Sequence, residues 1–166
     1  MDVKFTKGRD KDYIEARRAD GTIVSTTFPK KGRFPHDAVH LIVENRLGYR
    51  HAFWGRIFAG SAPEEIAAIA KAGGHASSAR AVLPTDDIVE LVRAERLVEC
   101  FEAEMWGGPS DNTTFRNVVE AACSQSRIPS PNLADEEIDG IRAELNHSFA
   151  QWHTLPVGQS LSLHWQ

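Results

Sequence analysis

The last stretch of the chain is the feature that most restricts the fold. The segment "GQSLSLHWQ", residues 158–166, alternates apolar and polar positions, with Leu161, Leu163 and Trp165 on one face. A single strand is not stable alone in water, so this one must pair with strands elsewhere. The other alternating patterns lie within the first 28 residues. We therefore expect the two ends of the chain to meet in one sheet.

The N-terminal segment predicts a strand followed by a β-hairpin. "VKFTK" alternates apolar and polar residues, and "DYIEARRADGTIVSTTF" carries a turn signal at Ala19-Asp20-Gly21. If Gly21 takes the left-handed position of a three-residue loop, Ala16 opposes Val24. The apolar face of the hairpin then consists of Ile14, Ala16, Val24 and Phe28. A two-residue loop would mix the two faces, so the hydrophobic pattern selects the longer turn.

Between these strands the apolar residues recur with helical spacing. The expected helices cover about residues 35–47, 53–58, 61–72, 86–106, 113–123 and 135–152, with a loop at 74–83. No alternation of strand and helix and no Gly-rich phosphate loop interrupts this order. The sequence therefore predicts a single α+β domain over residues 1–166, in which a small, mainly antiparallel sheet packs against a layer of about five helices.

Composition restricts the setting of the protein. No apolar run approaches the roughly 18 residues that span a bilayer, and the N-terminus lacks the apolar core of a secretory signal. The two cysteines, Cys100 and Cys123, lie on separate predicted helices and form no CxxC pair, so we expect buried thiols. These features favour a soluble cytoplasmic protein without a membrane partner.

Charge is distributed unevenly along the chain. Residues 1–34 contain nine Lys/Arg and five Asp/Glu, whereas the whole chain has a net charge of −4. A basic segment can contact phosphate backbones, but its few aromatic residues are not interleaved with the bases as a stacking platform requires. Lysines on exposed strands also discourage aggregation between sheet edges. We favour this second role and do not expect nucleic-acid binding.

The segment "PHDAVHLIVE", residues 35–44, contains the candidate site. His36 and His40 have the spacing of the zinc-protease motif H-E-x-x-H, with Asp37 at the position of the general base. Residues four apart face the same way on a helix, so both imidazoles could bind one divalent metal such as zinc. Asp37 and Glu44 are the candidate catalytic carboxylates. The candidates for a third ligand are Glu44, His51, Glu64 and Glu65.

A purely structural role explains the same residues. Asp37 would meet the positive end of the helix dipole, and His40 would border the core with its nitrogens hydrogen-bonded. Aspartate is also shorter than the glutamate of the protease motif. Glu102 and Glu104 flank an apolar stripe on the longest predicted helix, and we expect both on a solvated face.

Residues 34–60 and the C-terminal segment "WHTLPVGQSLSLHW" resemble a group of small bacterial proteins of unknown function. The shared features are a Pro-His-Asp-x-x-His helix, a Gly-Phe-Trp-Gly-like segment and a final tryptophan-bearing strand; here Ala52 replaces the first glycine of that segment. The resemblance covers about a quarter of the chain and carries over no catalytic residue. It implies that His36 and His40 lie near Trp54.

Two functional hypotheses follow from the sequence. The first, which the sequence favours, is a non-catalytic module that binds a small ligand or a protein, with Phe53 and Trp54 as binding residues and a homodimer as one form of self-association. The second is a metal-dependent hydrolase centred on His36 and His40. Coordination of one ion by both imidazoles would distinguish the second from the first.

Overall fold

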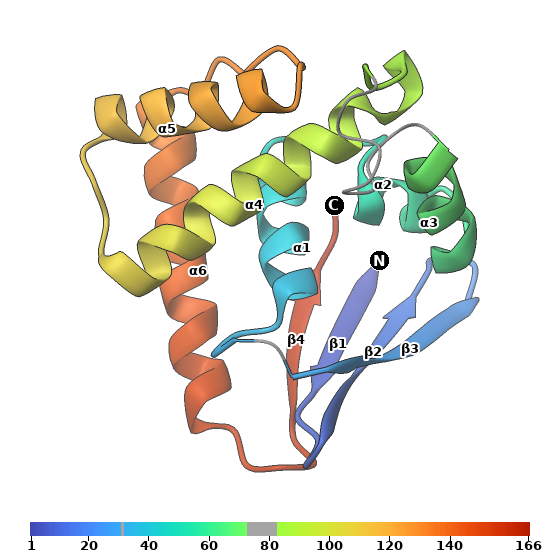
Figure 1. Ribbon diagram of the computed structural model, residues 1–166. Coiled ribbons are helices and arrows are strands. Elements are labelled where there is room, and N and C mark those ends of the chain that lie inside the picture. The colour runs from blue at the N-terminus through green and yellow to red at the C-terminus, as the bar shows by residue number, and fades with distance from the viewer. Residues whose placement is uncertain (31, 73–82) are drawn as a thin grey trace.

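The computed structural model describes residues 1–30, 32–72 and 83–166. Figure 1 shows a four-stranded antiparallel sheet in the order β3-β2-β1-β4. The strands are β1 (Asp2–Thr6), β2 (Lys11–Arg17), β3 (Ile23–Pro29) and β4 (Ser160–His164). The C-terminal strand pairs with β1, Val3 opposite Leu163. The expectation that both chain ends share one sheet is confirmed.

The hairpin has the predicted register. Ala16 of β2 lies opposite Val24 of β3, and Gly21 adopts a φ of +86°, a conformation that glycine takes without steric cost. The residues that line the inner face of the sheet are Val3, Phe5, Ile14, Ala16 and Leu161, all buried. The hydrophobic pattern therefore determined which face of the hairpin meets the helices.

In the described residues between β3 and β4, the chain forms six α-helices and a short 3₁₀ helix. They are α1 (His36–Arg46), α2 (Phe53–Phe58), α3 (Pro63–Ala72), η2 (Asp86–Ile88), α4 (Val89–Gly107), α5 (Asn112–Gln125) and α6 (Asp135–Thr154). The α+β class is confirmed. Within the described ranges, no helix combines the length and the apolar character needed to cross a membrane. The loop expected at 74–83 lies almost wholly outside the described residues.

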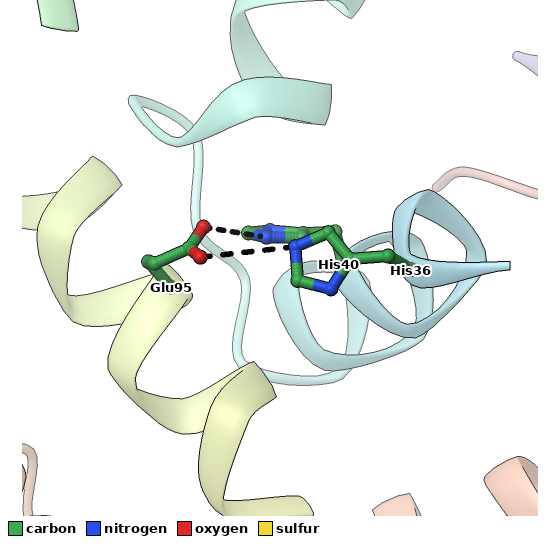
Figure 2. Close-up of side chains that lie close together, drawn as sticks. All are labelled: His36, His40 and Glu95. Carbon is green, nitrogen blue, oxygen red and sulfur yellow. Dashed lines mark hydrogen bonds and ion pairs between the residues drawn. The ribbon is translucent and has the colours of Figure 1, made fainter. Parts of the chain in front are cut away.

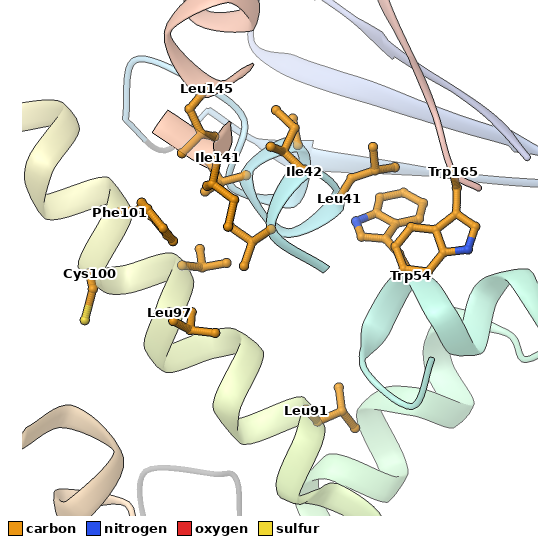
Figure 3. Close-up of a cluster of buried hydrophobic side chains, with 14 of the residues drawn as sticks. Leu41, Ile42, Trp54, Leu91, Leu97, Cys100, Phe101, Ile141, Leu145 and Trp165 are labelled. Atoms are coloured by element: carbon orange, nitrogen blue, oxygen red, sulfur yellow. The ribbon is translucent and has the colours of Figure 1, made fainter. Parts of the chain in front are cut away.

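Helix α1 lies at the centre of the core. Its apolar residues Leu41 and Ile42 are at most 1% exposed, and α1 contacts both α4 and α6. Figure 3 shows how side chains of these three helices meet, with Trp54 and Trp165 packed close to Leu41. Because α1 is surrounded by other elements, the direction of each of its side chains is fixed by packing.

Helix α2 is anchored tightly to the turn after α1. A Cβ atom at Gly55 would lie 2.4 Å from the carbonyl oxygen of Arg50, so only glycine allows this approach. This contact explains a glycine inside the predicted helix. Phe58 is 43% exposed, because it lies at the C-terminal end of α2.

Candidate metal centre

The polar row of α1 begins at the first helical residue. Pro35 precedes the helix with extended backbone angles, and Asp37 lies in the first turn. His36, His40 and Glu44 follow at intervals of four, so their side chains leave the helix on one side. Val39 and Val43 lie on the buried side and are at most 1% exposed. The predicted row of polar residues on α1 is therefore present.

Both imidazoles meet the same carboxylate, which belongs to α4. The Nε2 atom of His40 lies 3.1 Å from Oε2 of Glu95, and the Nε2 atom of His36 lies 3.8 Å from Oε1. Figure 2 shows the Glu95 carboxylate facing the two rings. Donor atoms of the three residues all lie within 4.8 Å of one another. This grouping joins two segments 55 residues apart in the sequence.

The other nitrogen of each imidazole is held by a carboxylate of its own. Nδ1 of His40 lies 2.9 Å from Oε1 of Glu44, and Nδ1 of His36 lies 3.1 Å from Oε1 of Glu102. Glu44 is completely buried, and its second oxygen accepts a hydrogen bond of 2.7 Å from the backbone N–H of Trp54. These contacts fix the orientation of both rings and leave both Nε2 atoms directed at Glu95.

The carboxylates favour the protonated imidazoles in the absence of a metal. Hydrogen bonds to Glu102 and Glu95 raise the pKa of His36 to about 10. Burial disfavours the charged form of His40, but hydrogen bonds to Glu44 and Glu95 outweigh it and raise its pKa to about 9. Burial would raise the pKa of Glu95, yet its contacts with the two histidines hold it well below its usual range. Burial raises the pKa of Glu44. In the metal-free cluster, both imidazoles are therefore held as cations by hydrogen-bonded carboxyl groups.

The spacing of the three Glu95-centred donors is close to that of a metal site. Zinc ligands lie about 2.1 Å from the ion, so two donors of a tetrahedral site lie about 3.4 Å apart. The two observed distances, 3.1 Å to Oε2 and 3.8 Å to Oε1 of Glu95, are of this size, and the donor atoms of all three residues lie within 4.8 Å of one another. Metal-bound histidines also commonly donate their second N–H to a carboxylate, as Glu44 and Glu102 allow here. Two imidazoles and one carboxylate form a three-ligand set that leaves a fourth position for water or substrate.

Asp37 is the carboxylate of this region that the histidines do not engage. It is half-buried, and within the described part of the chain no hydrogen bond to its side chain is found. Burial raises the pKa of its carboxyl group. Its backbone oxygen accepts a hydrogen bond of 2.8 Å from the indole nitrogen of Trp54. A carboxylate with free oxygens beside two imidazoles can accept a proton.

A cavity of about 470 Å³ adjoins the histidine cluster. His36, Asp37 and Glu102 contribute its polar wall. The other residues lining the cavity are Phe28, Gly32, Arg33, Phe34, Val39, Met105, Trp106 and Phe149. This volume lies within the range of small-molecule sites, which are mostly apolar with a few polar groups. A ligand in the cavity would therefore contact His36 and Asp37.

Several predicted site residues lie elsewhere. His51 is exposed and is not a member of the cluster, and Glu65 accepts a hydrogen bond from the backbone N–H of Ala62. Phe53 and Trp54 line a separate cavity of about 200 Å³, which Asp37 also borders. Trp54 is 2% exposed, so its role here is mainly in packing.

Sequence reasoning missed the part that α4 plays. Glu102, expected on a solvated face, contacts His36, and Glu104 pairs with Arg142, so that expectation is wrong for both residues. The short motif at residues 35–44 gives no indication of Glu95, which lies on another helix. The available signal was their position, because Glu95 and Glu102 lie seven residues apart and therefore on one face of the helix.

Helix α2 is connected to α1 by Trp54. Its backbone N–H donates to Glu44, and its indole N–H donates to the backbone oxygen of Asp37.

Comparisons with models of protein families, with curated proteins and with solved structures gave no match for this chain.

Proposed function

We propose that His36, His40 and Glu95 bind one divalent transition-metal ion and that the protein is a metal-dependent hydrolase. One observation carries the proposal. Both imidazoles direct Nε2 at the carboxylate of Glu95, and each Nδ1 is hydrogen-bonded to a carboxylate of its own. A set of two histidines and one glutamate is the ligand set of several zinc hydrolases. This proposal adopts the second of the two hypotheses raised by the sequence, with Glu95 as the third ligand.

A zinc ion in such a site supplies a water whose pKa is lowered to about 7. Asp37 is the residue we assign to accept the proton of that water, because its carboxylate borders the cavity and is not bound by either histidine. Glu44 instead positions His40, since both of its oxygens are already hydrogen-bonded. The substrate would occupy the cavity that His36 and Asp37 line. Hydrolysis then adds the hydroxide to the substrate and returns the proton to the leaving group.

The non-catalytic alternative has support of its own. The cavity is largely apolar, and two protonated histidines among carboxylates form a stable network without any metal. In that case the protein would bind a small ligand without transforming it. The two functions differ in one measurable property, because only the hydrolase requires a bound ion.

The test is metal analysis of the purified protein by inductively coupled plasma mass spectrometry after growth with zinc, iron and manganese. We expect close to one equivalent of zinc in the wild type and less than a tenth of that in His36→Ala and Glu95→Gln. His51→Ala is the matched control, because it removes an exposed histidine outside the cluster. We expect it to retain the metal.

Two outcomes would overturn the metal site. Equal metal content in the wild type and His36→Ala would place the ion elsewhere. Absence of metal in a folded wild type that also fails to take up added Zn²⁺ would favour the non-catalytic alternative. Iron in place of zinc would agree with the ligand set but would contradict the hydrolase, because two histidines and one carboxylate bind iron in oxygenases.

A further inference from the structure

Among the described residues that line the cavity beside the histidines, Arg33 is a cationic side chain that the metal site does not explain. The guanidinium carbon of Arg33 lies 5.7 Å from the ring centroid of Trp106 and 5.7 Å from that of Phe149. Both distances are within the range of cation–π contacts. Two aromatic rings thus hold the guanidinium group beside the cavity that all three residues line.

Arg33 has no anionic partner among residues 1–30, 32–72 and 83–166. Its guanidinium group carries five N–H donors, and no hydrogen bond from them to another described residue is found. Arg142 shows the opposite arrangement, with two N–H groups on the carboxylate of Glu104. The donors of Arg33 are therefore available to an anion.

The remaining walls define the rest of the ligand. Phe34, Val39 and Met105 provide apolar surface, and Phe149 contacts Phe34 edge-on with ring centroids 6.3 Å apart. Asp37 and Glu102 also line the cavity. Those carboxylates repel an anionic group, whereas Arg33 attracts one. Charge complementarity therefore determines which end of a ligand lies at Arg33.

We infer that the cavity binds a small molecule with an aromatic or other apolar body and one carboxylate or similar anion, and that Arg33 binds the anion. This inference rests on the proposed function insofar as the molecule is the substrate, with its hydrolysable bond near His36 and Asp37. The binding of the apolar body and of the anion uses no metal ligand other than His36. It can therefore be measured on the metal-free protein.

The test compares three naphthalene probes of nearly equal size by isothermal titration calorimetry in EDTA. The probes are naphthalene-2-carboxylate, neutral 2-naphthylmethanol and cationic 2-naphthylmethylammonium. We expect the carboxylate to bind about tenfold more tightly than the alcohol, and the ammonium probe to bind most weakly. Arg33→Ala should bring the ratio of carboxylate to alcohol affinity close to one, and Arg33→Lys should keep most of the preference.

A further variant tests the apolar wall, and another serves as the control. Trp106→Ala should weaken the binding of both the carboxylate probe and the alcohol probe, because the exposed indole forms part of the cavity wall. Arg17→Ala is the matched control. It removes an exposed arginine that pairs with Glu15 away from this cavity, and both affinities should remain unchanged.

Equal binding of carboxylate and alcohol, tighter binding of the ammonium probe, or an unchanged preference in Arg33→Ala would overturn the inference. Metal content separates these failures from failure of the proposed function. A protein that holds zinc at His36 but shows no preference for the carboxylate contradicts only the ligand class. A protein that prefers the carboxylate but takes up no metal contradicts only the hydrolase.

Discussion

Helix α4 contributes to two polar clusters whose key glutamates are two residues apart, and the clusters differ in charge balance. Glu104 pairs with Arg142 of α6 through two hydrogen bonds of 2.8 Å each. Its Oε1 atom also accepts hydrogen bonds from the N–H and hydroxyl groups of Ser110. One cation and one anion face each other with their hydrogen-bonding groups occupied. This cluster needs no further partner.

The cluster that contains Glu102 is different. Glu44, Glu95 and Glu102 bind only two histidines, and Asp37 adds a fourth carboxyl group nearby. Burial raises the pKa of both Glu44 and Asp37, so the ionised forms of these two carboxyl groups are disfavoured. Helix α4 thus forms a complete ion pair with α6 through Glu104 and, with α1 through Glu95 and Glu102, a cluster in which carboxyl groups outnumber the two histidines. A divalent cation would stabilise the ionised forms of those carboxyl groups.

The largest expected effect is the pH dependence of metal binding. His36 and His40, with pKa values of about 10 and about 9, are both protonated at neutral pH, so a metal must displace two protons. The apparent affinity for Zn²⁺ should therefore rise by about a hundredfold per pH unit between about pH 6 and pH 8. Calorimetry in buffers of different ionisation enthalpy should detect the release of nearly two protons.

Stability of the metal-free protein supplies the control for that measurement. Raised histidine pKa values stabilise the fold fully below the unfolded value of about 6.5, and this contribution is lost as the pH rises through about 9 to 10. The melting temperature of the metal-free protein should fall over this interval. The fall should be smaller in the double variant that carries both His36→Gln and His40→Gln. A fall of equal size in that double variant would contradict the pKa assignment.

The next largest effect is expected at Glu44. Glu44→Ala leaves His40 and the backbone N–H of Trp54 without their buried acceptor. Removing one partner of a buried ion pair costs about 3–5 kcal/mol, so the free energy of unfolding in urea should fall by that amount. Glu44→Gln retains an acceptor for the backbone N–H of Trp54, so its free energy of unfolding should fall by less. A loss below about 1 kcal/mol in Glu44→Ala would show that water replaces the carboxylate.

The two glutamates of α4 allow a direct test of the comparison. Glu102→Gln weakens the acceptor that orients His36, and loss of such an outer partner lowers metal affinity by about tenfold to a hundredfold. Glu104→Gln changes the same residue type two positions away and should leave Zn²⁺ affinity unchanged. Competition with a chromophoric chelator measures the Zn²⁺ affinity of both variants. Similar losses in both variants would mean that the two clusters are not independent.

The smallest effect is expected from Arg142→Lys. Lysine cannot reproduce the two parallel hydrogen bonds of the guanidinium group, and the charge stays the same. Because the Arg142 side chain is 15% exposed, we expect the free energy of unfolding to fall by about 1–2 kcal/mol. Metal content should not change. Loss of metal in this variant would connect the Arg142 cluster to the histidine site.

The parts of the structure that the sequence predicted depend on local spacing. The face of the hairpin follows from the two-residue period, and the row from His36 to Glu44 follows from the helical repeat. Glu95 could not be identified in this way, because its contact with His40 spans 55 residues and depends on how α4 packs against α1. Periodicity places Glu95 at the border of an apolar stripe. It does not reveal which neighbouring helix that border faces.

The pairing of β4 with β1 has a consequence for biosynthesis. β1 has a neighbour on each side, and one of them, β4, follows the α-helices α1 to α6 of the described residues. A nascent polypeptide still lacking β4 exposes one edge of β1 while these helices are already synthesised. Pairing of the two strands brings Asp2 opposite His164, a contact between residues far apart in the sequence, and such long-range contacts slow folding.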